Sequence, residues 1–171
     1  MAEPYYNRDF PKLRSLGFRR ASEPADYNCI AFVVGDLEHW WWPSGREDEY
    51  WPLPVPDKVT LQSFIDALVV VGYVRCGDGS PEPGLEKIAL YGLDEEHIKH
   101  AARLEASKET WQSKLGPDED IEHTLEGLDG PCYGRVLAYL SKRRDASPGQ
   151  APPSIPLASR AAGTEGQTPS G

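Results

Sequence analysis

Hydrophobic positions repeat with two different periods along the chain, and these periods predict its helices and strands. A short apolar run follows an aspartate and precedes a glycine, which predicts a buried helix that begins at Asp26 and ends at Gly35. Further on, apolar side chains recur every three or four positions, which predicts a second helix over residues 57–72, capped by Asp57 or Thr60.

The second half of the chain is rich in strand-like segments with short links between them. Strands are predicted over residues 73–76, 86–91, 97–104 and 110–115. The links between the last three are short enough for antiparallel hairpins. Residues 120–128 and residues 133–140 are predicted to be helices. Helices first and an antiparallel sheet afterwards indicate an α+β fold.

Composition divides the chain into a folded part and a tail. Residues 1–144 hold almost all of the large apolar side chains and are expected to form one domain. Residues 145–171 consist mainly of Pro, Gly, Ser, Ala and Thr, with little to bury, so a disordered tail is expected.

The charge and cysteine content exclude several classes of function. The formal net charge is −9 and the pI is about 4.9, which argues against a nucleic-acid surface or an anionic membrane as partner. No signal pattern and no span of about 20 apolar residues is found. Three widely spaced cysteines, none at Cys-x-x-Cys spacing, indicate a reducing cytoplasm and no zinc site. No metal or cofactor is expected, and the oligomeric state stays open.

One cysteine is placed where a nucleophile could form. Cys29 falls in the first turn of the predicted helix, where the helix dipole favours a thiolate; the alternative is a small thiol in the core. A thiol nucleophile needs a base and an orienting group. His100 in a predicted strand is the candidate base, with Ser113 or Asp120 to orient it. The amide of Asn28 is the candidate donor to an oxyanion.

Three consecutive tryptophans follow the first predicted helix. On a helix or a strand they point in different directions, so at least one is expected near solvent or in a groove. Trp41 and Trp42 are therefore candidate walls of a substrate cleft. The alternative is that this segment and the proline-rich loop after it only cover the Cys29 helix.

The order of these elements resembles that of a known fold. A cysteine at a helix start, a histidine strand and a polar residue at the end of the next strand are the order of papain-like cysteine peptidases, which include the NlpC-type cell-wall peptidases. Residues 100–102 look like the histidine strand and residues 111–116 like the strand with the orienting residue. On that match, Ser113 lies where papain-type enzymes carry Asn. The resemblance implies helices packed on a small antiparallel sheet.

The chain resembles an uncharacterised bacterial protein family more closely. The likeness extends over roughly residues 27–140 and is carried by residues 28–31, 41–43, 82–87, 100–102 and 111–116. It implies a fold more than a reaction.

Two hypotheses of function follow. The first is a cysteine hydrolase that cleaves an amide, peptide or isopeptide bond with Cys29 as nucleophile and His100 as base, so that Cys29 would be the most reactive thiol. The second is a non-catalytic papain-like module that binds a protein or glycan through its tryptophan-rich loop. In both hypotheses, the main substrate or partner expected is a peptide or a protein.

Overall fold

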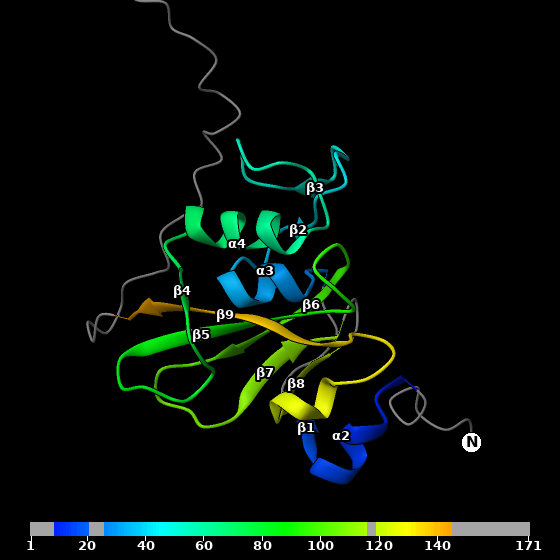
Figure 1. Ribbon diagram of the computed structural model, residues 1–171, viewed down its shortest axis with the longest axis vertical. Helices are drawn as coiled ribbons and strands as arrows, with labels where there is room; N and C mark the ends of the chain where they lie inside the picture. Colours follow the sequence, from blue (N-terminus) through cyan, green and yellow to red (C-terminus); the bar gives the residue numbers. More distant parts are fainter. Residues whose placement is uncertain (1–8, 21–25, 116–118, 145–171) are drawn as a thin grey trace, which may run out of the picture.

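Pairing between strands that are far apart in the sequence organises the fold. The computed structural model describes residues 9–20, 26–115 and 119–144 (Figure 1). Within this described part, seven strands form one antiparallel sheet in the order β1-β8-β7-β6-β5-β9-β4. The strands are β1 (Phe18–Arg20), β4 (Val74–Cys76), β5 (Leu85–Gly92), β6 (Ile98–Leu104), β7 (Trp111–Lys114), β8 (Asp120–His123) and β9 (Arg135–Arg143). Together with the helices they make an α+β fold, as the sequence predicts.

Helices cover both faces of this sheet. The helices α3 (Cys29–Val34) and α4 (Leu61–Val70) lie over one face, which we call the upper face because it is uppermost in Figure 1. The helix α2 (Pro11–Leu16) and the 3-10 helix η1 (Leu125–Leu128) lie under the opposite, lower face. The sheet is therefore buried on both sides along its centre.

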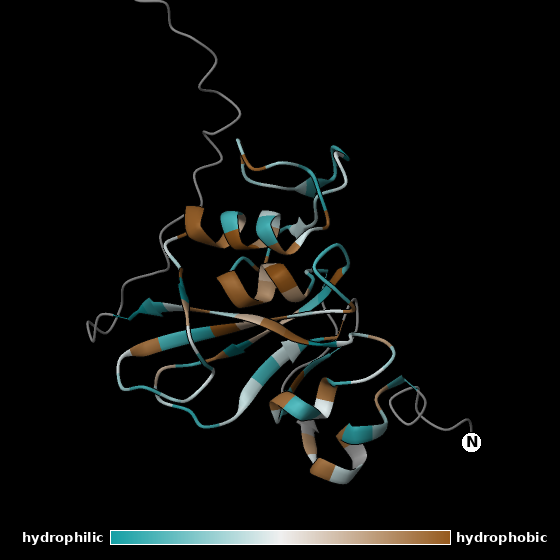
Figure 2. Cartoon of the chain, in the orientation of Figure 1, coloured by the Kyte–Doolittle hydropathy of each residue, from teal (hydrophilic) through white to brown (hydrophobic). Residues whose placement is uncertain are grey.

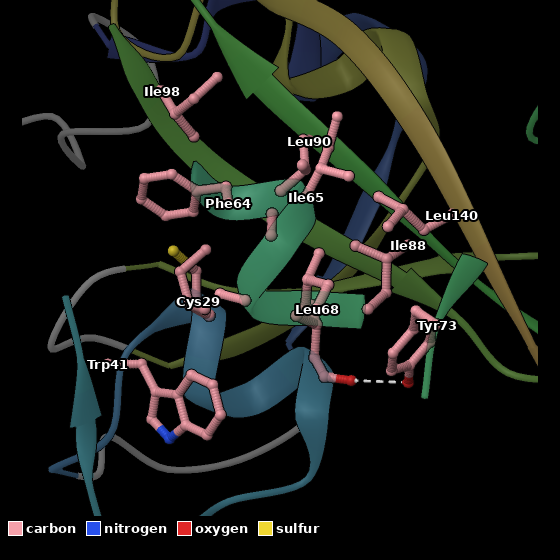
Figure 3. Close-up of a cluster of buried hydrophobic side chains, with 14 of the residues drawn as sticks. Cys29, Trp41, Phe64, Ile65, Leu68, Tyr73, Ile88, Leu90, Ile98 and Leu140 are labelled. Atoms are coloured by element: carbon pink, nitrogen blue, oxygen red, sulfur yellow. Dashed lines mark hydrogen bonds between the residues drawn. The ribbon is translucent and has the colours of Figure 1, made fainter. Parts of the chain in front are cut away.

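Each face has its own hydrophobic cluster. The cluster on the upper face joins α3 and α4 to the sheet (Figure 3) and includes Cys29, Phe64, Leu68, Leu90, Ala101 and Leu140. Apolar residues run along α3, and they alternate with polar residues on α4 (Figure 2). The cluster on the lower face joins α2 and η1 to the sheet and includes Leu13, Tyr91, Ala102, Leu104, Trp111 and Ile121. The sheet separates the two clusters.

Side-chain caps begin both helices of the upper face. α3 is capped by Asn28 rather than by Asp26, because the Asn28 side chain accepts a hydrogen bond from the amide of Ala31. It ends at Gly35, whose left-handed φ of 80° suits glycine, as expected. α4 is capped by Thr60, one of the two predicted caps, through the amide of Ser63.

The chain between the two helices forms an additional layer. Residues 36–57, which we call the tryptophan segment, lie beside α3 and α4 (Figure 1). Their regular structure is one short parallel pair, β2 (Trp40–Trp41) and β3 (Glu49–Tyr50). The segment is held to the helices by its aromatic side chains and by hydrogen bonds between the Asn28 side chain and the backbone of Trp41, rather than by a ladder.

Two of the helix predictions in the second half are wrong. Residues 120–128 form the strand β8 and the short 3-10 helix η1 instead of one helix. Residues 133–140 belong mostly to β9, which pairs with β5 on one side and β4 on the other. Both faces of β9 are covered, and its register with β5 shifts at Leu137, so its apolar residues do not alternate. A continuous apolar run of this kind looks the same as a buried helix in the sequence.

No helix of the described ranges is long and apolar enough to cross a membrane. The predicted disordered tail, residues 145–171, lies outside the described residues.

The start of β9 depends on a glycine. Gly134 has a φ of 74°, and a Cβ there would overlap the carbonyl of Gly92. We expect Gly134→Ala to lower the free energy of unfolding by more than about 3 kcal/mol, because a steric clash adds to the backbone cost of about 1–2 kcal/mol. Gly84→Ala is the matched control: its φ is 75° but nothing lies near the added Cβ. Urea unfolding measures both, and equal losses would contradict the close approach.

Candidate functional site

The residues predicted to form a catalytic site are distributed over both faces of the sheet. Asn28 uses its whole side chain to join α3 to β2. Its Oδ1 accepts from the amides of Ala31 (3.1 Å) and Trp41 (3.2 Å), and its Nδ2 donates to the carbonyl of Trp41 (2.7 Å). The donor that would have served an oxyanion is therefore already used within the fold.

The Cys29 thiol is a buried core thiol. Its residue is 6% exposed, and burial raises the pKa of the thiol to about 11. Hydrogen bonds from the backbone of Ala101, Ile30 and Cys29 itself act in the opposite direction but do not offset burial. The thiol therefore stays protonated at neutral pH, whereas the dipole argument had favoured a thiolate.

His100 points away from Cys29. Consecutive residues of a strand point to opposite faces. Ala101 contacts the upper cluster and the Cys29 thiol, whereas His100 belongs to the lower face. There its ring stacks on Tyr133, with centroids 4.1 Å apart, and meets Tyr91 edge-on at 5.7 Å. The structure therefore does not bring the predicted nucleophile and base together.

His100 is also neutral and without hydrogen bonds. The residue is fully buried, and neither ring nitrogen has a hydrogen-bond partner among the described residues. Burial, with His123 nearby, holds the pKa of His100 well below its usual value. Its role in this structure is that of an aromatic ring in the lower core.

Ser113 orients a different histidine. Its hydroxyl lies 2.6 Å from Nε2 of His123, and Nδ1 of His123 lies 2.6 Å from the carbonyl of Thr124. A carbonyl only accepts, so Nδ1 carries the proton and Ser113 donates to Nε2. The distance is that of a nucleophile and its base, but Ser113 is fully buried, which leaves a substrate no access. The sequence predicts a short helix at this position, which favours a solvated His123 and leaves a metal or base role as the remote alternative; the observed strand β8 instead buries it.

Asp120 lies on the upper side of the sheet, away from His100. One of its carboxylate oxygens accepts a hydrogen bond of 2.9 Å from the hydroxyl of Tyr27. Tyr27 packs in the upper cluster and stacks on Phe32. Neither Asp120 nor Ser113 is therefore the orienting partner of His100 that the sequence analysis expected.

The two candidate cleft residues are packing residues. Trp41 is fully buried, and its indole nitrogen donates to Asp36 at 2.7 Å. Trp42 is half-buried with its ring edge-on to Phe64, at 5.4 Å between centroids. Trp41 therefore cannot wall a cleft, and Trp42 faces a helix.

Asp36 fixes the beginning of the tryptophan segment. Besides the indole of Trp41, its carboxylate accepts from the amide of Glu38 and from the ring and amide of His39. Although burial acts to raise it, these bonds hold the pKa of Asp36 below its usual value. The anchoring bonds of the segment thus point inwards.

Two large apolar side chains of the tryptophan segment are exposed to solvent. Leu37 is 60% exposed and Leu53 is 56% exposed. Trp40 is half-buried, and residues 44–48 between β2 and β3 are exposed. The aromatic anchors below and the exposed leucines above make this segment the best candidate for a functional surface. Within the described ranges, no three His, Cys, Asp or Glu side chains come together as a metal site.

The thiols should differ in reactivity in an order that burial decides. At pH 7.5 we expect iodoacetamide to modify the exposed Cys132 and the half-buried Cys76 first, and Cys29 at least tenfold more slowly. Mass spectrometry of the alkylated full-length chain measures the order, with a sample unfolded in urea as the control in which all three react. Modification of Cys29 as fast as Cys132 would restore it as a candidate nucleophile.

The two buried histidines should make the fold sensitive to acid. Burial holds the pKa of His123 at about 4 and that of His100 well below the ordinary 6.5. Below pH 6.5 the unfolded chain takes up protons that the folded chain excludes, so stability falls as the pH drops towards 4. The loss at pH 5 is about 2 kcal/mol for His123, and His100 adds to it in the same direction.

His100→Phe keeps a ring against Tyr133 and removes one of the titrating groups. We expect it to reduce the stability difference between pH 7.5 and pH 5 in urea unfolding, with no loss at pH 7.5, because no hydrogen bond disappears. An undiminished difference between the two pH values would show that His100 is not excluded from solvent.

Comparison with known proteins places the chain in a family. No curated protein and no solved structure matches it. A family model described as a domain of unknown function, DUF7689, matches residues 19–141. The match begins in β1 and ends in β9, so it includes the whole sheet and both upper helices. The chain therefore belongs to the DUF7689 family.

Proposed function

We propose that this chain is a non-catalytic module that binds a protein partner through the outer surface of its tryptophan segment. The observation that carries the proposal is the division of that segment into an inner and an outer side. Trp41, Trp42 and Trp51 are turned inwards, whereas Leu37 and Leu53 are largely exposed. Binding residues are found disproportionately on loops that a rigid scaffold positions, and this segment is a loop anchored on two helices.

The anchoring makes this surface rigid in advance of binding. Trp42 and Trp51 both meet Phe64 of α4, at 5.4 Å and 5.1 Å between centroids, and the indole of Trp51 donates to the carbonyl of Pro56. A surface that is ordered before binding loses less conformational entropy when a partner docks.

The charges of the segment indicate the chemistry of the partner. It contains six carboxylates, Asp36, Glu38, Glu47, Asp48, Glu49 and Asp57, and one arginine, Arg46, which pairs with Asp48 at 2.9 Å. Of the carboxylates, Glu38, Glu47, Asp48 and Asp57 are exposed. The complementary surface is an apolar patch with a basic rim.

A protein is a better partner than a glycan for this segment. Glycan binding by tryptophans needs an open ring face for the sugar to stack on. Trp41 is fully buried, and the rings of Trp42 and Trp51 pack on Phe64. Only Trp40 of this group, which is half-buried, lacks a ring contact among the described residues.

The papain-like arrangement and the hydrolase are the alternative hypothesis. A cysteine-bearing helix, a second helix and an antiparallel sheet in that order support the papain-like part. The protonated, buried Cys29 and the position of His100 on the other face do not support catalysis. We therefore prefer the binding module. Slow alkylation of Cys29 would count against the hydrolase, and alkylation as fast as that of Cys132 would count in its favour.

The binding proposal is tested by changing the exposed leucines. The full-length chain is immobilised, a protein that it retains from an extract of the source cells is purified, and its Kd is measured. We expect Leu37→Ser/Leu53→Ser to weaken binding more than tenfold, because the apolar contact is lost. Binding should also weaken as salt is raised, because of the basic rim.

Two variants serve as matched controls. Leu93→Ser alters a leucine that is 49% exposed but lies outside the tryptophan segment, and Cys29→Ser alters the candidate nucleophile. Both should leave the Kd unchanged. Equal binding by the double leucine variant and the wild type would overturn the proposal.

A further inference from the structure

A pocket lies beside the first half of α4, and none of the candidate catalytic residues lines it. Its volume is about 350 Å³, and it opens to solvent. It is bounded by the start of α4, by the turn that precedes β6, and by Arg75 of β4. This size is at the lower end of small-ligand sites, which are about 300–1,000 Å³.

The lining combines both signs of charge with an apolar floor. Lys58 and Arg75 supply positive charge, Glu95 and Glu96 supply negative charge, and the buried Leu61 and Ile65 supply apolar surface. None of the four charged side chains has a hydrogen bond or ion pair with another described residue. By contrast, Lys87 elsewhere in the sheet pairs with Glu82 at 2.8 Å. Four charges around one hollow are thus available to a ligand.

The walls of the pocket are held in place by the backbone. The amide of Leu61 donates to the carbonyl of Glu95 at 2.7 Å, and the amide of Ile98 donates to the carbonyl of Val59 at 3.2 Å. The amide of Glu96 donates to the side chain of Asp94 at 2.8 Å. The turn with the two glutamates is therefore fixed on the start of α4, and the pocket exists before a ligand arrives.

We propose that this pocket binds a small zwitterion with one carboxylate and one ammonium group, of the size of an amino acid or a dipeptide. Arg75, a planar cation with several donors, binds the carboxylate, with Lys58 as a second positive charge. Glu95 and Glu96 bind the ammonium group. The aliphatic part of the ligand lies on Leu61 and Ile65. This site is separate from the protein-binding surface proposed above.

The proposal is tested with three dipeptide probes that differ in one charge each. Glycyl-L-leucine carries both charges, N-acetylglycyl-L-leucine lacks the ammonium group, and glycyl-L-leucinamide lacks the carboxylate. Titrated into the full-length chain and followed by calorimetry, the first is expected to bind with a Kd below about 1 mM. Each of the other two should bind at least tenfold more weakly.

Variants assign each charge to its partner. Arg75→Gln should weaken glycyl-L-leucine at least tenfold and leave the amide probe as weak as before. Glu95→Gln/Glu96→Gln should also weaken glycyl-L-leucine at least tenfold, and it should leave the acetylated probe as weak as before. Arg135→Gln, an exposed arginine outside the pocket, is the matched control and should change nothing. Circular dichroism checks that each variant is folded.

Three outcomes would overturn the proposal. They are no binding of glycyl-L-leucine at 10 mM, equal affinity for all three probes, and equal effects of Arg75→Gln and Arg135→Gln. None of these outcomes bears on the proposed protein-binding surface, because its test changes different residues and measures a different partner.

Discussion

The alternation of side chains along β6 is the constraint on which the rest of this structure depends. His100 and Ala101 are neighbours in a central strand, so their side chains enter different cores. Ala101 lies under α3 and beside the Cys29 thiol, whereas His100 stacks on Tyr133 below the sheet. The sheet lies between the two cores and separates them. The side chains of Cys29 and His100 therefore lie on opposite faces of the sheet.

The buried polar groups that resemble catalytic machinery have structural partners. Asn28 joins a helix start to β2, Ser113 donates to His123, and Asp120 accepts from Tyr27. Each of these bonds satisfies a group that would otherwise be costly to bury. The described residues give no hydrogen bond to His100, which is neutral and flanked by aromatic rings, and none to Oδ1 of Asp120. The hydrogen-bonded polar residues of the cores thus contribute to the stability of the fold.

Much of the fold follows from local sequence signals, and the failures have physical causes. The cap at Thr60 and the glycine at position 35 are read correctly because they act within one turn of a helix. The strands β5 to β7 carry short links that favour hairpins. β9 was taken for a helix because it is covered on both faces, and the start of α3 was misplaced because Asn28, two residues later, also caps well. The pocket was missed because Arg75 and the two glutamates meet only through the tertiary fold.

The sequence provides the least information on which face of the sheet each strand side chain points to. Strand alternation places His100 and Ala101 on opposite faces of the sheet, but the sequence does not show which of these faces the helix that carries Cys29 covers. A direct measurement is the pattern of nuclear Overhauser effects from the His100 ring in the ¹³C-labelled full-length chain. The account predicts effects to the rings of Tyr91 and Tyr133 and none to the β-protons of Cys29. An effect between His100 and Cys29 would contradict it.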